Sequence, residues 1–382
     1  MFHFNFLKKY KKISKTPKKK NILFSFMKWA LNIIIFAFAG ITIVIVGCRT
    51  FNYIDCRVNT SGVNESIFVP LGGQEQYLLI QGKNTQNPVI IWLHGGPSSP
   101  DTFVNYVFQK YLIDDYTIIN WDQRGCGRTY FHNEDKDASN DTASFEQAQT
   151  DLNDLVDYAC NRFNTEKVII IGHSYGSMLG SQYVLNHPEK ISAYIGVGQA
   201  ITMESDLYIY KNALEKAILL GDDTQEMEDA YQKYMEDKSL INAMNLRNYT
   251  VKYHAPQKTS NPIWFGITSP YMGFDDVRWF LKQSGDFEKY VALNKQLFDY
   301  IMEIDVREYG LEYQVPVGFI TGSDDWTTPS IYAEDYYNTI SAPEKQFSLV
   351  DGCGHSPQYD SPEEFCSILK NMLDELITAP LS

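Results

Sequence analysis

The stretch 167–176 constrains the fold more than any other part of the chain. It reads K-V-I-I-I-G-H-S-Y-G, with Ser174 between Gly172 and Gly176. Four consecutive β-branched residues predict a strand that is buried on both faces, and a helix is expected after the serine. Small residues two positions before and after the serine let the strand and the helix pass closely, which leaves the serine at a strained turn with its hydroxyl exposed. The pattern therefore predicts a nucleophile at Ser174.

The same turn predicts a site for a negatively charged oxygen. The backbone N–H of Tyr175 opens the expected helix and points toward the reacting centre, where it can meet a developing oxyanion. A second donor is expected in the turn His94-Gly95-Gly96, which follows another buried strand. Gly96 is the favoured residue, because glycine lets a substrate approach the backbone closely. Gly96 and Tyr175 are thus the predicted oxyanion hole.

A serine hydroxyl needs a base, and the base needs an orienting carboxylate. His355 lies in a glycine-rich loop after the last expected strand, and Asp325 follows Gly322 at the end of the strand before it. Because the carboxyl ends of parallel strands meet at one edge of a sheet, these residues can converge on Ser174. We expect His355 to be the base and Asp325 its orienting partner, with Asp324 as the alternative.

The pattern of strands and helices predicts an α/β fold with a mostly parallel sheet. It also predicts a core over residues 66–200 and 315–382. Residues 201–314 interrupt the alternation; they are acidic, rich in aromatics and read as helical, which favours an inserted helical cap. Helical stretches are expected there around 213–235 and 275–304. Strands are expected at 66–71 and 76–81, joined by a Gly72-Gly73 turn, and at 88–93, 116–121, 167–171, 191–197, 315–321 and 346–350.

The N-terminal region predicts a membrane anchor. Residues 29–48 carry no charge, and at 1.5 Å per residue such a helix spans about 30 Å, the thickness of a bilayer core. Residues 1–28 hold nine lysines and no acid, so they form a basic tail that should stay in the cytoplasm. Residues 49–65 then read as a linker to a domain outside the cytoplasm. The alternative is a lipoprotein, because residues 45–48 end in the small-residue-then-cysteine pattern of a site lipidated at Cys48.

Charge and cysteine content narrow the partners. The formal net charge is −14, and the basic tail holds nine of the 33 basic residues but none of the 47 acidic ones. The remaining body is strongly acidic, which argues against a nucleic-acid partner. The six cysteines have neither a C-x-x-C nor a Cys/His metal spacing. They leave both free thiols and one or two disulfides open, and no metal or organic cofactor is expected.

Four motifs together resemble the α/β-hydrolase superfamily and, more narrowly, the proline iminopeptidases. The resemblance implies an eight-stranded, mostly parallel sheet with a helical cap, and hydrolysis through an acyl-enzyme without a cofactor. It also matches Ser174, Asp325 and His355 to the family triad, and Gly96 and Tyr175 to its oxyanion hole. The motifs are His94-Gly95-Gly96-Pro97, D-Q-R-G-C-G-R at 122–128, G-H-S-Y-G at 172–176 and Gly354-His355.

The chain departs from that family at several positions. Ser98 follows H-G-G-P where a glycine is common, Tyr175 stands where tryptophan is common, and Thr129 stands where serine is common. An aminopeptidase must also hold the ammonium of its substrate with an anion. Glu204 is the predicted substrate contact in the cap, with Asp206, Asp275 and Asp276 as further candidates on charge alone.

The sequence thus predicts a membrane-tethered serine hydrolase. The first expectation for its substrate is a short peptide from which an N-terminal residue, such as proline, is removed. The alternative within the same fold is an esterase or amidase acting on small acyl substrates. A non-catalytic binding protein that retains the fold is the alternative from a different class.

Overall fold

The computed structural model describes residues 18–56, 61–255 and 257–378, and the chain divides into two compact units. One unit extends to Phe51 and the other begins at Asn52. Residues 1–17 of the predicted basic tail and residues 57–60 of the predicted linker lie outside the described residues. Each unit is described by itself.

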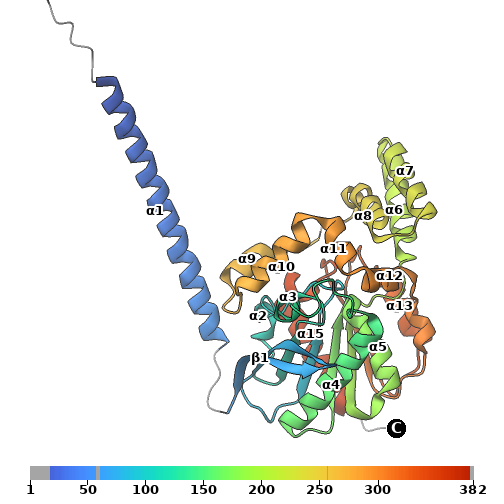
Figure 1. The fold of residues 1–382 in the computed structure, drawn as a ribbon. Coiled ribbons are helices and arrows are strands. Elements are labelled where there is room, and N and C mark those ends of the chain that lie inside the picture. The colour runs from blue at the N-terminus through green and yellow to red at the C-terminus, as the bar shows by residue number, and fades with distance from the viewer. Residues whose placement is uncertain (1–17, 57–60, 256, 379–382) are drawn as a thin grey trace, which may run out of the picture. The chain divides into compact units, whose positions relative to one another are not determined.

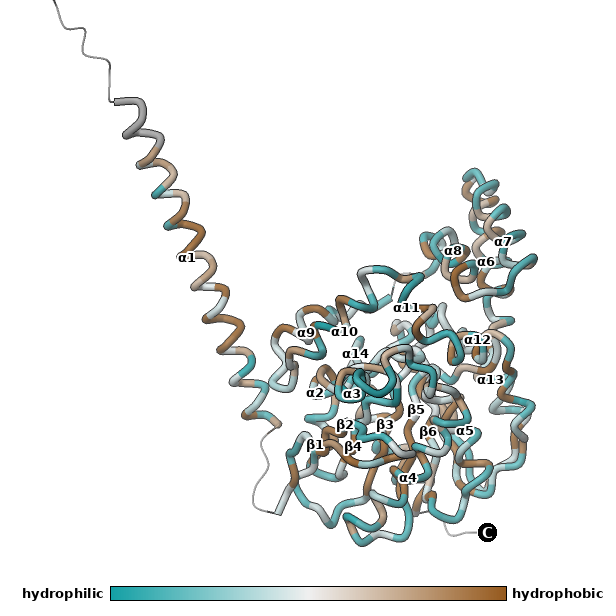
Figure 2. Tube along the Cα trace, viewed as in Figure 1, coloured by the Kyte–Doolittle hydropathy of each residue, from teal (hydrophilic) through white to brown (hydrophobic). Residues whose placement is uncertain are grey.

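The first unit contains most of helix α1 (Lys18–Asp55), which is apolar along much of its length (Figure 2). Its segment Phe24–Asp55 is the one helix among the described residues that is long and apolar enough to cross a membrane. None of its apolar window is buried against protein. A signal sequence near an N-terminus has the same length and composition, so these features identify a candidate span.

The second unit is built on an eight-stranded sheet in the order β1-β2-β4-β3-β5-β6-β7-β8. Strand β2 pairs antiparallel with both of its neighbours, and all pairs from β4 onward are parallel. The predicted mostly parallel sheet, its eight strands and the hairpin at Gly72-Gly73 are confirmed. The strands are β1 (Val63–Leu71), β2 (Gln74–Gly82), β3 (Val89–Leu93), β4 (Thr117–Trp121), β5 (Val168–His173), β6 (Ile191–Val197), β7 (Val317–Gly322) and β8 (Lys345–Val350).

Helices cover both faces of this sheet (Figure 1). Alternate residues of β3 and β5 point to opposite faces, so Ile91 and Ile170 join one buried cluster while Trp92 and Ile171 join the other. The first cluster packs under α4 (Phe145–Phe163), α5 (Tyr175–Asn186) and α13 (Ser330–Thr339). The second packs under α2 (Tyr106–Gln109) and α15 (Pro362–Thr378). The short helices α3 (Gly127–Asn133), η1 (Pro188–Lys190) and α14 (Pro357–Asp360) lie in the connections.

The segment between β6 and β7 is helical, but it is more broken than the sequence suggested. Gly221 adopts φ 74° and ends α6 within the first expected stretch. Asp286 is extended and accepts a hydrogen bond from the Lys289 amide, which starts a new helix within the second stretch. The elements are α6 (Ser205–Leu220), α7 (Gln225–Glu236), α8 (Leu240–Thr250), η2 (Val251–Tyr253), α9 (Pro262–Thr268), α10 (Phe274–Gly285), α11 (Phe287–Leu293), α12 (Lys295–Glu303) and η3 (Val306–Tyr309).

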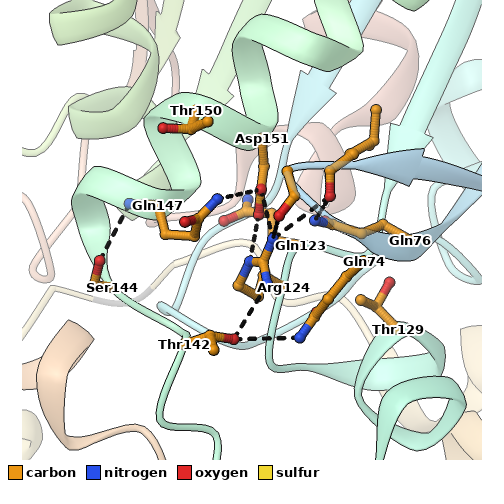
Figure 3. A network of polar contacts seen from close by, with 12 residues as sticks. Gln74, Gln76, Gln123, Arg124, Thr129, Thr142, Ser144, Gln147, Thr150 and Asp151 are labelled. Carbon is orange, nitrogen blue, oxygen red and sulfur yellow. Dashed lines mark hydrogen bonds and ion pairs between the residues drawn. The ribbon is translucent and has the colours of Figure 1, made fainter. Parts of the chain in front are cut away.

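A buried ion pair fastens the loop after β4 to helix α4 (Figure 3). Arg124 donates from Nε to Asp151 Oδ2 at 2.7 Å and from Nη2 to Asp151 Oδ1 at 2.8 Å. The side chains are only 4% and 0% exposed. Arg124 Nη2 also donates to the Gly72 carbonyl at 2.7 Å, and Gln147 donates to Asp151. One guanidinium therefore joins the β1–β2 turn, the loop after β4 and helix α4.

We expect Asp151→Asn to lower the free energy of unfolding by about 3–5 kcal/mol, because it leaves the buried guanidinium without a countercharge. Chemical denaturation of the detergent-solubilised chain measures this change. The matched control on the same helix is Asp157→Asn, whose partner Lys190 is partly exposed. That control should cost less than about 1 kcal/mol. Equal effects of the two substitutions would contradict the role given to the buried pair.

Candidate active site

Ser174 occupies the turn between β5 and α5 with φ 54° and ψ −121°, a backbone conformation that side chains other than glycine rarely adopt. The two flanking glycines make this turn possible. A Cβ on Gly172 would lie 2.2 Å from the Gly176 carbonyl oxygen, and a Cβ on Gly176 would lie 2.2 Å from the Leu93 carbonyl oxygen. The Ser174 amide donates to the Val197 carbonyl at 3.0 Å, which ties the turn to β6.

His355 and Asp325 contact each other directly. His355 Nδ1 lies 2.9 Å from Asp325 Oδ2, and the carboxylate side chain is fully buried. Asp325 Oδ1 accepts hydrogen bonds from the amides of Thr327 and Thr328 at 2.8 and 2.9 Å. Since a carboxylate oxygen accepts, Nδ1 of the histidine is the donor, and Nε2 remains available to accept a proton.

The surroundings of Asp325 favour its ionised form. Burial opposes ionisation, but the charge and hydrogen bond of His355, together with the amides of Thr328 and Thr327, lower the pKa of the carboxyl below its ordinary value. The Thr328 hydroxyl also donates to Asp325 Oδ2 at 2.9 Å and lies 3.1 Å from His355 Nδ1. The neighbouring Asp324 accepts from the Ser323 hydroxyl instead.

Two further histidines brace the site without titrating near neutral pH. Burial, followed by the charge of His355, lowers the pKa of His173 to about 3. Its Nε2 lies 2.9 Å from the His355 carbonyl oxygen, so this nitrogen carries the proton and donates. Burial also lowers the pKa of His94 to about 4. Its Nδ1 donates to the Gly95 carbonyl at 2.8 Å, and its Nε2 accepts from the Gln123 amide at 3.3 Å.

The predicted oxyanion residues lie at a cavity of about 200 Å³ that Ser174 also lines. Gly96 has φ 120° and a Cβ there would lie 2.7 Å from the Ser99 amide nitrogen, so only glycine fits. Tyr175 is the first residue of α5, and an amide at that position has no partner within its helix. A neighbouring hollow is lined by Ser174, His355 and Gly96 together.

The predicted acidic contacts of the cap lie elsewhere. Glu204 is exposed just before α6, and among the described residues it does not line the cavity. Its role as a substrate contact stays a prediction. Asp206 is buried against Arg247 at 2.7 Å, Asp275 pairs with Arg278 at 2.9 Å, and Asp276 pairs with Arg128 at 2.5 Å.

Sequence reasoning missed three features of the site. Thr328 supports the Asp325 carboxylate, and the order Asp-x-Thr-Thr before a helix is a recognisable signal for such a turn. Gly198 leaves room for His355, because a Cβ there would lie 3.2 Å from the imidazole. Arg247 lines the cavity from α8, and no local pattern could have placed it there.

The comparisons agree with this architecture. A family model described as the alpha/beta hydrolase fold matches residues 88–236. A probable aminopeptidase, YbaC of Bacillus subtilis, is 24% identical over 316 residues, covering 78% of this chain and 93% of its own. The proline iminopeptidase of Lactobacillus acidophilus is 24% identical over 310 residues, covering 80% and 97%. The crystal structure of a bacterial membrane phospholipase A superposes with a TM-score of 0.59 at 16% identity, covering 94% and 100%.

The chain has the α/β-hydrolase fold, with helices inserted between β6 and β7. Within that class its sequence is similar to proline iminopeptidases and to a probable aminopeptidase, which supports a hydrolase.

We expect acid to destabilise the fold through His94 and His173. Both stay unprotonated when folded, but in the unfolded chain each binds a proton below about pH 6.5. Stability is therefore fully present above that pH. It should fall by about 1.4 kcal/mol per histidine for each pH unit as the pH drops toward 4. Denaturant unfolding at a series of pH values measures this slope.

His173→Gln should make that slope shallower by the share of one histidine. The matched control is His187→Gln, which removes a partly exposed histidine at the end of α5. An unchanged slope in His173→Gln, or an equal change in the control, would contradict the assignment of a neutral, buried His173.

Proposed function

We propose that this chain is a serine hydrolase that acts through an acyl-enzyme. Ser174 attacks the substrate carbonyl, His355 accepts the hydroxyl proton at Nε2 and returns it to the leaving group, and Asp325 orients the imidazole. The observation that carries the proposal is the 2.9 Å contact between His355 Nδ1 and the buried Asp325 carboxylate, beside a serine held at φ 54°. Water then attacks the acyl-enzyme, with His355 again acting as the base.

The oxyanion of each tetrahedral intermediate is bound by the backbone N–H groups of Gly96 and Tyr175. Support for this role comes from their position at one cavity with Ser174 and from the open N-terminus of α5. Such preorganised donors contribute most where charge develops during the reaction.

The first proposed activity is removal of an N-terminal residue from short peptides. Its support is the similarity to relatives named aminopeptidase and proline iminopeptidase. The second candidate is hydrolysis of small esters or amides without recognition of an amine. It is favoured by the cavity lining, which among the described residues is mostly apolar and contains no carboxylate. The match to a membrane phospholipase A structure supports only the shared fold.

We further propose that residues 29–48 tether the catalytic domain to the membrane as a single-pass anchor with the domain outside the cytoplasm. Support comes from the apolar helix Phe24–Asp55 and from the nine lysines that precede the uncharged stretch. Lipidation at Cys48 is the alternative form of the same tether.

Ser174→Ala should abolish hydrolysis, with a loss in kcat on the order of a millionfold, as expected when a triad serine is removed. Three substrates then separate the two activities in the detergent-solubilised chain: an unblocked prolyl amide, the same amide with its amine acylated, and a short-chain ester. Strong preference for the free amine is expected of an aminopeptidase. Turnover of the ester alone, or indifference to the amine, would support the second candidate.

Labelling by a fluorophosphonate controls for the class of protein. The wild-type chain should be labelled at Ser174 and the alanine variant should not. A folded wild-type chain that resists labelling and turns over no substrate would contradict the hydrolase proposal and favour a binding protein.

Cys48→Ala should leave the chain in the membrane fraction, because an uncleaved helix needs no lipid. Intact-protein mass spectrometry of the membrane-bound wild-type chain should then show the N-terminal residues still attached. Release of the variant into the soluble fraction, or a mature chain that begins at a lipid-modified Cys48, would contradict the uncleaved anchor.

A further inference from the structure

Arg247 gives the cavity at Ser174 a positively charged wall. It lies on α8 and lines the same 200 Å³ cavity as Ser174, Gly96 and Tyr175. Among the described residues that line this cavity, it is the only one with a charged side chain. A guanidinium at the wall of a mostly apolar cavity is costly to desolvate unless it serves a structural or binding role.

The guanidinium is held in place from behind. Arg247 Nε donates to Asp206 Oδ1 at 2.7 Å, and Asp206 is only 1% exposed on α6. Within the described part of the chain, the two Nη groups have no hydrogen-bond partner. Since Arg offers its donors as a planar fork, the Nη groups can still bind a carboxylate. Asp206 does not line the cavity itself.

The groups packed against this wall do not supply a competing anion to the cavity. Lys216 of α6 donates to the Tyr253 carbonyl and lies over the ring of Trp326, which in turn stacks on His254. Burial, followed by the charges of Lys216 and Arg247, lowers the pKa of His254 to about 4, so this histidine is neutral at pH 7. Asp206 is the buried countercharge, shared with the guanidinium alone.

We propose that Arg247 forms a binding subsite for a carboxylate on the substrate, remote from the carbonyl that Ser174 attacks, with Asp206 as its positioning residue. The substrate class is then a short peptide with a free C-terminal carboxylate, or a monoester of a dicarboxylic acid. This inference rests on the proposed serine hydrolase activity and narrows its substrate. It differs from the recognition of an amine, for which the cavity offers no carboxylate.

Three para-nitrophenyl esters of matched length test the subsite: the hexanoate, the monoester of adipic acid and the ω-aminohexanoate. The full-length chain in detergent should hydrolyse the adipate monoester with a kcat/KM about ten- to a hundredfold above that of the hexanoate, the range expected for a hydrogen-bonded charge pair. Arg247→Met should remove this preference and leave hexanoate turnover within about twofold. Arg247→Lys should restore part of it, because the charge returns without the fork.

The matched control is Arg278→Met, which removes a half-exposed arginine of the cap paired with Asp275 and Glu134. It should leave the ratio of the two rates unchanged. A prolyl dipeptide and its C-terminal amide distinguish the two sources of the carboxylate. Preference for the dipeptide that is lost in Arg247→Met assigns the subsite to a peptide terminus, and preference confined to the adipate monoester assigns it to a dicarboxylic acid.

Failure of the subsite and failure of the hydrolase proposal give different results. A chain that is labelled at Ser174 but shows no preference for the adipate monoester, prefers the ω-amino ester, or turns over none of the esters overturns the carboxylate subsite alone. A preference that survives Arg247→Met overturns it as well. A folded chain that is neither labelled nor active overturns the hydrolase proposal itself.

Discussion

The close passage of β5 and α5 at Ser174 is the constraint on which the site depends. A side chain at Gly172 or Gly176 would collide with backbone oxygens, because an added Cβ would lie 2.2 Å from them. Without that passage Ser174 could not hold φ 54°, and the N-terminus of α5 would not open beside its hydroxyl. Strain of this kind costs on the order of 1–3 kcal/mol, so the surrounding sheet must enforce it. The buried strands on either side of β5 supply that rigidity.

A second chain of contacts holds the opposite wall of the site. The buried pair of Arg124 and Asp151 fixes the loop after β4, and Gln123 of that loop donates to both the ring and the carbonyl of His94. His94 in turn precedes the turn that contains Gly96. The conserved geometry of an oxyanion site does not arise from the glycine alone, since a flexible turn would lose preorganisation. Burial of polar groups far from the reacting atoms therefore serves the position of a single amide.

The inserted helices decide what reaches the serine. They place Arg247 at the cavity and leave the acidic residues of the cap paired or exposed elsewhere. The acidic composition of residues 201–314 had favoured recognition of an ammonium, whereas the charge that faces the cavity is positive. Composition reports the sum over a surface, and a binding site depends on the few side chains that point inward.

The sequence by itself determined the sheet, its hairpin and the residues that follow β5, β7 and β8, because buried strands and glycine-flanked turns leave a strong local pattern. Local signals also located the start of α4, where Ser144 accepts from the Gln147 amide. The tertiary structure decided the contact of His355 with Asp325 in place of Asp324, the support from Thr328, the breaks at Gly221 and Asp286, and the position of Arg247. These depend on where segments far apart in the chain meet. The spacing of residues along one helix cannot specify which of its side chains faces a cavity lined by another part of the fold.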